Sequence, residues 1–282
     1  DETPRYGIVK IAIKAASGST LTNQTKLDIV NGLKKYNVAS VKPEIIDPQT
    51  TSVLLTSNIK FDAKSTTKSA TTLKSDIIDS ITNYNTTTLQ KFDGVFRHSK
   101  LTGLIDDTDN SILSNITTVK MRKSFTPTIN SATKYDIFFR NALYNPHTGH
   151  NASGGGILSS TGFKVSGNNN EMFLDEDGNG NVRRYYLVSG VKTYADSNQG
   201  TINYTTGQVT LNLMNVASIS NIRGSASTII EITVTPNSND VVPVRDQIVE
   251  IDVANSLITV EEDSFVGGSA EAGVGYTTST SY

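Results

Sequence analysis

Four stretches in the first half of the chain alternate between apolar and polar residues. They are residues 8–14, residues 38–47, a stretch that ends at residues 58–64, and a stretch around Val119 and Met121. Apolar side chains at every second position predict strands that bury one face. Pro43 in the second stretch indicates an edge strand or a bulge, because proline has no N–H to donate to a neighbouring strand.

Helical patterns lie between these predicted strands. Apolar residues recur at helical spacing from about Thr22 to Tyr36 and from about Lys68 to Asn83. The predicted buried stripes are Leu27, Val30 and Leu33 in the first helix, and Leu73, Ile77, Ile78 and Ile81 in the second. A shorter helical stretch from about Thr86 leads to an acidic turn. The order of elements is therefore β-α-β-β-α-β.

This order predicts a split-βαβ, or ferredoxin-like, module over residues 1–128. We expect two helices to cover one face of a four-stranded sheet. The opposite face would meet solvent or a neighbouring subunit.

The second half of the chain contains strand and turn patterns without a helix of ordinary length. Residues 134–145 predict a strand, and hairpins are predicted with turns at 175–181 and 205–207. Further strands are predicted within 227–263. We expect an antiparallel β-rich domain over 129–266 and a flexible Gly/Ser/Thr-rich tail over 267–282. The predicted fold class is α+β.

Composition narrows the possible functions. The 282 residues carry a formal net charge of −2, which argues against sequence-independent nucleic-acid binding. The chain has no cysteine, which excludes disulfides, thiolate metal sites and a cysteine nucleophile. No apolar run is long enough to cross a bilayer, and DETPRYG at the start is not a signal peptide. Since the sequence does not begin with Met, we expect a fragment of a longer protein.

The tightest acidic cluster is Asp106, Asp107 and Asp109 within the stretch 99–123. It could hold a divalent metal or supply the carboxylate pair of a glycosidase, which needs one protonated and one ionised group at a fixed separation. Aspartate and asparagine are also ordinary turn residues. We interpret the cluster as a turn that ends a helix, not as a catalytic or metal site.

The sequence DEDGNGN at 175–181 matches part of a calcium-binding loop. Asp175, Asp177, Asn179 and Gly180 occupy its first, third, fifth and sixth positions, but the twelfth position is Tyr186 instead of a bidentate carboxylate. Asp-Gly and Asn-Gly also favour tight hairpin turns. We interpret the segment as a hairpin tip and leave weak calcium binding open.

Histidine is scarce in this chain. His147 and His150 have a spacing that suits half a zinc site, but His98 is the only other histidine in the sequence. Zinc needs three or four oriented ligands. We therefore predict loop histidines, and we predict no catalytic, cofactor-binding or metal-binding residue. No nucleophile elbow, P-loop or dinucleotide fingerprint is present.

Several stretches resemble one known family. They are YGIVKIAIK, VKPEIIDP, the long run FRHSKLTGLIDDTDNSILSNITTVKMRKSFTPTIN, LSSTGF, and the hairpin pattern G-x-I-x-Y-x-T-G. In order, they resemble the C-terminal part of the baseplate wedge protein that forms the inner baseplate ring in T-even-type contractile-tailed phages. That family is related to the broader baseplate-J group.

The resemblance implies a structural protein of the virion without enzymatic activity, assembled in the host cytoplasm. It also implies paired copies in each wedge, a ring around the tail tube, contacts with other wedge proteins and rearrangement during sheath contraction. Neither nucleic acid nor membrane is an implied partner. The alternatives left open are a β-rich tail adhesin or carbohydrate-binding module, and a glycan-hydrolysing tail enzyme. An adhesin predicts an exposed aromatic platform, whereas Tyr185, Tyr186, Tyr194 and Tyr204 lie within predicted strands.

Overall fold

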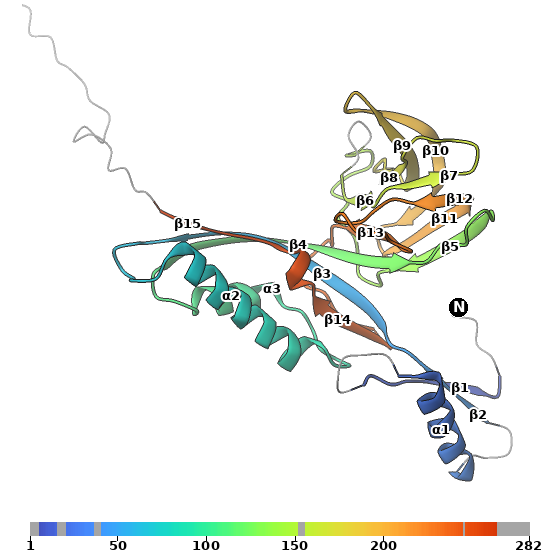
Figure 1. Ribbon diagram of the computed structural model, residues 1–282, viewed down its shortest axis with the longest axis horizontal. Coiled ribbons are helices and arrows are strands. Elements are labelled where there is room, and N and C mark those ends of the chain that lie inside the picture. Colours follow the sequence, from blue (N-terminus) through green and yellow to red (C-terminus); the bar gives the residue numbers. More distant parts are fainter. Residues whose placement is uncertain (1–5, 16–20, 37–40, 152–155, 245, 264–282) are drawn as a thin grey trace, which may run out of the picture.

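The structure is a computed structural model that describes residues 6–15, 21–36, 41–151, 156–244 and 246–263. The predicted tail at 267–282 lies outside these ranges. Figure 1 shows three parts: a small unit near the N-terminus, a long sheet with helices on one face, and a β-rich part beside the sheet. Among the described helices, none combines the length and apolar character that crossing a membrane requires.

The N-terminal unit consists of two strands and one helix. Strand β1 (Ile8–Ala12) pairs in parallel with β2 (Lys42–Ile46), and helix α1 (Asn23–Leu33) connects them with a 3₁₀ turn at Lys34–Tyr36. The hydroxyl of Thr22 accepts a hydrogen bond from Thr25 N–H at 3.1 Å, as expected of a threonine just before the first helical residue.

Two long strands form the centre of the main sheet. Strand β3 (Gln49–Phe61) pairs antiparallel with β4 (Ile112–Phe125) over most of its length. The other edge of β3 pairs in parallel with β14 (Gln247–Ile251) and then β15 (Leu257–Glu262). Beyond β4 lie β13 (Ile230–Val234) and β6 (Leu158–Ser160). The 3₁₀ turn Val253–Asn255 separates β14 from β15.

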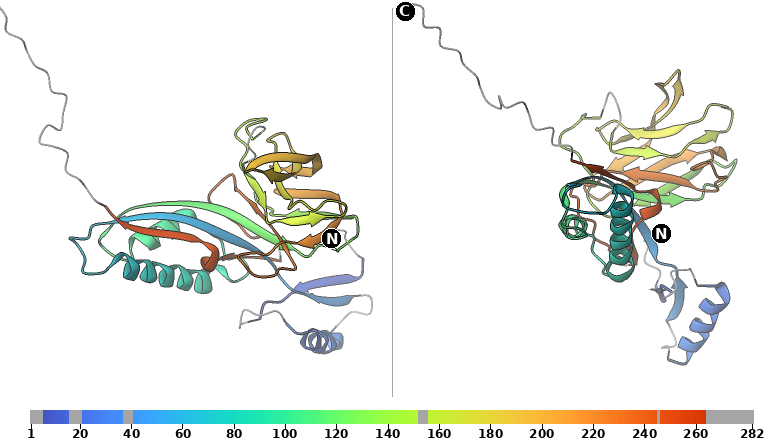
Figure 2. Two further views of the ribbon diagram at one scale, coloured as in Figure 1. Left: turned by 45° about the horizontal axis from the view of Figure 1, so that its top comes forward. Right: turned by 60° about the vertical axis from the view of Figure 1, so that its left-hand side comes forward.

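Helices cover one face of this sheet and leave the other face open along its outer end (Figure 2). Helix α2 (Ala70–Tyr84) continues into a π-helical turn at Asn85–Leu89, and α3 (His98–Asp106) follows. The stripe Leu73, Ile77 and Ile81 of α2 is fully buried, as its helical spacing predicted. Leu101 and Ile105 of α3 and Val119 and Met121 of β4 are buried in the same layer. Burying a side chain of this size stabilises the fold by roughly 1.5–3 kcal/mol.

The β-rich part contains a strongly curved antiparallel sheet in the order β5-β11-β10-β9-β8. These strands are β5 (Thr133–Phe138), β8 (Phe173–Glu176), β9 (Asn181–Val188), β10 (Val191–Asn203) and β11 (Gln208–Met214). The pair β7 (Phe163–Val165) and β12 (Val216–Ile219) lies nearby. Both predicted hairpins, β8–β9 and β10–β11, are confirmed.

The coarse prediction of a mixed fold with an antiparallel β-rich part is confirmed, but the ferredoxin-like module is not. β1 and β2 form a sheet of their own and do not join β3 and β4. Strand β3 has β4 on one edge and β14 and β15 on the other, so neither edge is left for β1 or β2. Only Asp47 and Pro48 separate β2 from β3, so the chain passes directly from one sheet to the other.

The predicted domain boundary at residue 128 does not follow the sheets. Strands β13, β14 and β15 lie in the predicted second domain by sequence, yet they pair with β3 and β4. One hydrophobic cluster also runs from the helix-covered sheet into the β-rich part, where it includes Phe139, Phe163 and Val209. The strand patterns predicted the elements correctly but not their partners.

Candidate functional site

The acidic turn forms the end of α3, as the sequence predicted. Asp107 N–H donates to Gly103 O at 2.9 Å, and Thr108 Oγ1 donates to Leu104 O at the same distance, which closes the last helical turn. Asp109 then accepts a hydrogen bond from Ser111 N–H at 3.0 Å, the geometry of an Asx turn. The chain leaves this turn into β4.

One lysine joins this turn to α2. Lys68 Nζ lies 3.0 Å from Asp109 Oδ2 and 2.9 Å from Asp76 Oδ2. Hydrogen bonds from Ser111, followed by the effect of Lys68, lower the pKa of Asp109 to about 2. The same two carboxylates raise the pKa of Lys68. Asp109 is therefore a permanently charged structural partner at neutral pH.

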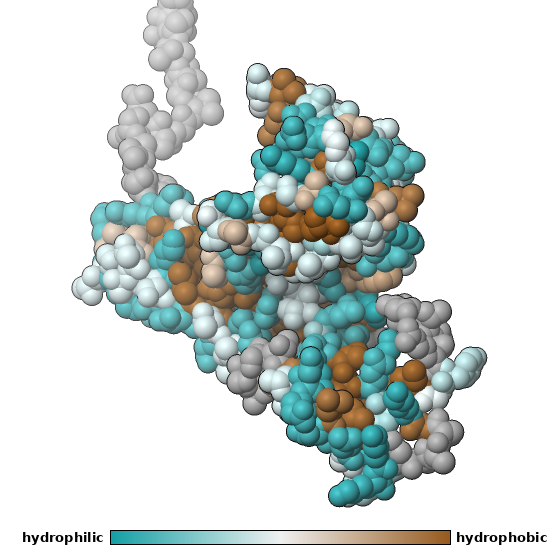
Figure 3. Space-filling model, turned by 45° about the vertical axis from the view of Figure 1, so that its right-hand side comes forward, coloured by the Kyte–Doolittle hydropathy of each residue, from teal (hydrophilic) through white to brown (hydrophobic). Residues whose placement is uncertain are grey.

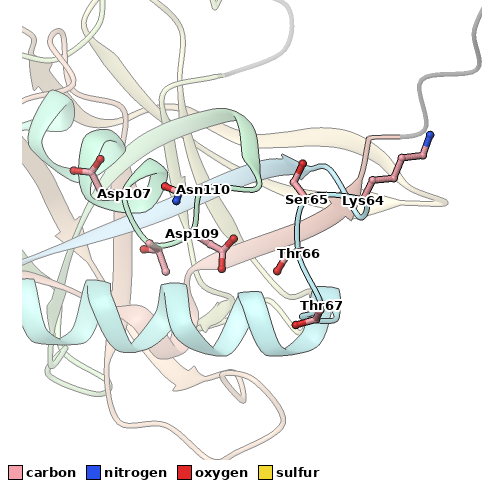
Figure 4. A pocket seen from close by; sticks show the side chains of 8 residues that line it. Lys64, Ser65, Thr66, Thr67, Asp107, Asp109 and Asn110 are labelled. Atoms are coloured by element: carbon pink, nitrogen blue, oxygen red, sulfur yellow. The ribbon is translucent and has the colours of Figure 1, made fainter.

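An open polar recess of about 620 Å³ lies between this turn and the β3–α2 loop. It is lined by Lys64, Ser65, Thr66, Thr67, Asp107, Thr108, Asp109 and Asn110. In Figure 4 the carboxylates of Asp107 and Asp109 point in different directions, and Asp106 does not line the recess. Among the described residues, no three His, Cys, Asp or Glu side chains converge as metal ligands. The geometry is that of a turn.

In the hairpin at 175–181, two acidic side chains point inward. Asp175 is 2% exposed, and it accepts hydrogen bonds from Arg183 Nε at 2.9 Å and Lys192 Nζ at 2.8 Å. The Tyr194 hydroxyl donates to the same carboxylate at 3.0 Å. Burial and this bond to Asp175 raise the pKa of Tyr194 to about 12. The Asp175 carboxylate therefore already has two cationic partners within the protein.

Glu176 is fully buried beside Asp175. Its carboxylate accepts hydrogen bonds from the Tyr204 hydroxyl and from Gly178 N–H, each at 2.5 Å, and from the side-chain amide of Asn151. Burial and the bond to Glu176 raise the pKa of Tyr204. These contacts fasten the hairpin tip to the preceding loop and to the end of β10. A buried carboxylate needs such donors, since an unpaired charge there would be costly.

The remaining positions of the calcium pattern serve the turn itself. Asp177 accepts from Asn179 N–H at 2.8 Å and from Asn181 N–H at 3.0 Å. Gly178 and Gly180 have φ of +76° and +97°, the backbone region that glycine adopts without strain. Tyr186 lies within β9, paired with Thr193 of β10. The segment is a hairpin tip, as interpreted from the sequence.

His98 lies apart from His147 and His150, which contact each other. His98 Nε2–H donates to Thr117 O of β4 at 2.9 Å. His150 uses both ring nitrogens: Nδ1–H donates to His147 O at 2.9 Å, and Nε2 accepts from the Asn151 amide at 2.8 Å. The rings of His147 and His150 meet edge to face, with centroids 5.6 Å apart. Both residues lie in the loop that rests on the hairpin tip.

The open face of the main sheet is a regular surface formed by its strands. Its side chains come from alternate positions of three neighbouring strands: Thr56, Asn58 and Lys60 of β3; Ser114, Ile116 and Thr118 of β4; and Leu257, Thr259 and Glu261 of β15. Ile116 and Leu257 are 67% and 60% exposed, and Lys60 pairs with Glu261 at 2.6 Å. Such a surface can bind another protein by shape and apolar contact, but it assembles no reactive group.

One edge of β4 is also without a strand partner within the described residues. Antiparallel pairing with β13 covers only Met121–Phe125, and the preceding part of β4 pairs with β3 alone. On the open side, His98 bonds to Thr117 O and the Asn115 amide donates to Thr102 O at 3.4 Å. These contacts with α3 use part of an edge that could otherwise pair with another chain.

Two of these regions are similar to known protein families. Residues 51–124 match the family described as baseplate structural protein gp6, C-terminal domain III, and residues 1–46 match C-terminal domain I of gp6. The chain resembles the C-terminal portion of a baseplate wedge protein. Baseplate wedge protein gp6 of Enterobacteria phage T4 is 32% identical over 120 residues, which cover 43% of this chain and 18% of that relative.

The gp6 match follows the structural division. The segment similar to domain I corresponds to the separate β1–α1–β2 unit, and the segment similar to domain III spans β3, α2, α3 and β4. The acidic turn and its flanking stretch 99–123 fall within the domain III match, so the resemblance drawn from that stretch is confirmed. The gp6 domain matches do not extend into the β-rich part.

Sequence reasoning missed the polar residues that hold this framework together. Glu176, Asn151 and Asn85 each bind groups far away in the sequence. Two acidic neighbours at 175 and 176 give no signal that both side chains point inward. The one available hint was the arginine pair that follows in β9, since buried carboxylates require cations.

Proposed function

We propose that this chain is a structural component of a contractile phage-tail baseplate wedge. The observation that carries the proposal is the ordered match of two segments to gp6 C-terminal domains I and III, each of which coincides with a folded unit. The proposed location is the tail baseplate of the virion, after assembly in the host cytoplasm. We retain the prediction of kinship with the baseplate-J group.

The proposed mechanism is assembly through surfaces instead of chemistry. Copies of the chain would pair within a wedge, and the wedges would join into a ring around the tail tube, with other wedge proteins as further partners. The open face of β3, β4 and β15 suits one such contact, because it exposes Ile116 and Leu257 among polar side chains. Closed rings repeat the same contact around one axis. Rearrangement during sheath contraction would shift these contacts while each unit stays rigid.

The proposal is tested by mass and assembly. The chain is purified, its solution mass is measured by light scattering, and it is mixed with the other wedge proteins for electron imaging. The variant Ile116→Asp with Leu257→Asp should reduce incorporation into wedges, because it places two charges on the open face. Leu213→Asp is the matched control, since Leu213 is 72% exposed on β11, away from this sheet. A chain that stays monomeric and never enters a baseplate would contradict the proposal.

The carbohydrate-binding alternative receives less support from the aromatic residues. Sugar-binding platforms need a free ring face, but Arg183 lies over the ring of Tyr194 at 4.3 Å and Lys192 lies over Tyr185 at 4.5 Å. The hydrolase alternative is tested with Asp106→Asn and Asp107→Asn in the intact fold. Loss of a glycan-cleaving activity in these variants would favour an enzyme.

A further inference from the structure

The β1–α1–β2 unit exposes an incomplete sheet. Its two strands pair in parallel, and no further strand joins them within the described residues. Parallel strands are normally covered on both faces, and two strands alone are marginally stable in water. Helix α1 packs over β2, yet none of its residues is fully buried. This unit can therefore pack against a further segment in addition to its own residues.

The two outer edges of this small sheet differ. Lys42 N–H donates to Gly7 O at 2.8 Å and Ile13 N–H donates to Ile46 O at 3.3 Å, so the main chain of these residues points between the strands. The alternate residues of β1 (Ile8, Lys10 and Ala12) therefore direct their N–H and C=O groups outward. On the outer edge of β2 the corresponding position is Pro43, which has no N–H to offer. The outer edge of β1 is therefore open to pairing with another strand, whereas Pro43 hinders such pairing at the outer edge of β2.

An apolar recess lies beside these strands. It has a volume of about 590 Å³, and its apolar walls are Ile8, Leu27, Val30, Pro43 and Ile45. Leu27 and Val9 are 56% and 48% exposed, and Figure 3 shows apolar residues at the surface of this unit, at the lower right. The recess can take one or two apolar side chains from an added segment.

The charge of this unit indicates which segment fits. The described residues 6–15, 21–36 and 41–47 carry six lysines and three acidic residues, a formal charge of +3, although the whole chain carries −2. Lys10 lies on β1 itself. The recess is bordered by Lys42 and Glu44, and by Lys26, which already pairs with Asp47 at 2.6 Å. Unlike charges favour encounter and fix the register of two chains. An acidic extended segment is the complementary partner.

We propose that the outer edge of β1 is a docking site for an extended, acidic segment of another protein. The segment adds as a third strand and places an apolar side chain in the recess. The chain's own acidic strand end, Glu261–Glu262, is already paired with β3, so a second copy offers no free strand of this chemistry within the described residues. The origin of this partner rests on the proposed function, under which it would be another baseplate protein.

The test uses the full chain and a fluorescent eight-residue peptide of alternating valine and glutamate, followed by anisotropy. A matched peptide has lysine in place of glutamate. The acidic peptide should bind at least about tenfold more tightly than the basic one, and more weakly as salt rises. Hydrogen exchange at the amides of Ile8, Lys10 and Ala12 should slow when the acidic peptide is added. Equal binding of the two peptides, or unchanged exchange, would overturn the proposal.

Variants separate edge pairing from simple charge attraction. Lys10→Pro removes an outward N–H without breaking a bond to β2. It should weaken the binding of the acidic peptide by about tenfold or more. Lys10→Ala keeps the N–H, so the affinity for the acidic peptide should fall by no more than about threefold. Leu27→Ser should also weaken binding, whereas Leu213→Ser should not. Unfolding by urea checks that each variant keeps the fold.

The remaining outcomes distinguish the occupants. Self-association of the chain that Leu27→Ser abolishes would mean that a second copy covers the site, which contradicts the proposal. Absence of peptide binding together with normal entry into wedges would overturn this inference alone. Failure to enter wedges, with the peptide still bound at β1, would overturn the proposed function instead.

Discussion

The side-chain amide of Asn85 pairs with the main chain of Ile251 in both directions. Its Nδ2 donates to Ile251 O at 3.0 Å, and its Oδ1 accepts from Ile251 N–H at 2.8 Å. Asn85 lies in the π-helical turn after α2, 166 residues before its partner. The Asn85 side chain therefore makes the hydrogen bonds with the outer edge of β14 that a neighbouring strand would make. It also links β14 to the helical layer.

Replacing this amide should destabilise the protein. Asn85→Ala leaves two buried main-chain groups of Ile251 without partners, so the free energy of unfolding should fall by about 2–4 kcal/mol. Asn83→Ala changes an exposed asparagine near the end of α2 and should cost no more than about 0.5 kcal/mol. Urea unfolding of both variants measures the difference. Equal stability of the two would show that the pairing with Ile251 contributes little.

A partly buried lysine should make stability depend on alkaline pH. Burial, and then the nearby Arg140 guanidinium, lower the pKa of Lys123 to about 8 from its ordinary 10.5. Between these values the unfolded chain binds a proton that the folded chain does not, so stability should rise with pH across that window. Lys123→Met should raise the free energy of unfolding at pH 7 by about 3 kcal/mol. The gain should disappear as the pH approaches 10.5.

A second lysine on the same strand provides the control for this prediction. Lys120 is exposed on the opposite face of β4, and Lys120→Met should change the free energy of unfolding by no more than about 0.5 kcal/mol. Unfolding curves at several pH values between 7 and 10.5 compare the two variants. If Lys123→Met gave the same small effect at every pH, the lowered pKa would be contradicted.

Alanine substitutions at two glycines distinguish the cost of backbone strain from the cost of a steric clash. Gly190 has φ of +83°, and no neighbouring atom lies within 4 Å of the position that an alanine Cβ would occupy there. Gly207 has φ of +68°, and a Cβ added to it would lie 2.2 Å from Asn141 O. Gly190→Ala should cost about 1–2 kcal/mol, the penalty for this backbone region alone. Gly207→Ala should cost more than about 3 kcal/mol, because the β10–β11 turn must also move away from Asn141. Thermal unfolding of both proteins checks the order.

The acidic turn should reveal its structural role at low pH. Because the folded pKa of Asp109 is lowered to about 2, its contribution is present above the ordinary pKa of aspartate and is lost as the pH falls from about 4 toward 2. Asp109→Asn should therefore be less stable than the parent protein at pH 6, and the difference should shrink at pH 2. Asp107→Asn serves as the exposed control. A constant difference at all pH values would contradict the lowered pKa of Asp109.

Local patterns predicted the elements well, for reasons visible in single residues. Thr22 caps α1, Leu73 and Ile81 are buried on α2, and the turns at 175–181 and 205–207 close hairpins. Each of these features depends on neighbours within a few positions. The family resemblance of the 99–123 stretch depended on local sequence in the same way.

The pairing of distant strands could not be predicted from such patterns. The apolar residues of β14 and β15 fit many buried strand positions, and no residue in either strand specifies β3 as its partner. The apolar stripe of α1 likewise predicted burial, whereas Leu27 is 56% exposed because the unit holds too few strands to cover it. The acidic residues at 175 and 176 could not be assigned to the interior before Arg183, Lys192 and Tyr204 were placed around them.

The parallel seam along β3 has a consequence for how the protein folds. Residues 49–61 meet residues 247–262, so about 200 positions separate the partners of this seam. Contacts of such long range are slow to form, since the intervening chain must first be brought together. During synthesis β3 and β4 can pair early, but the second edge of β3 must wait for the strands that come much later. Until then that edge is exposed to any passing strand, and the interval is when the protein is most vulnerable to misassembly.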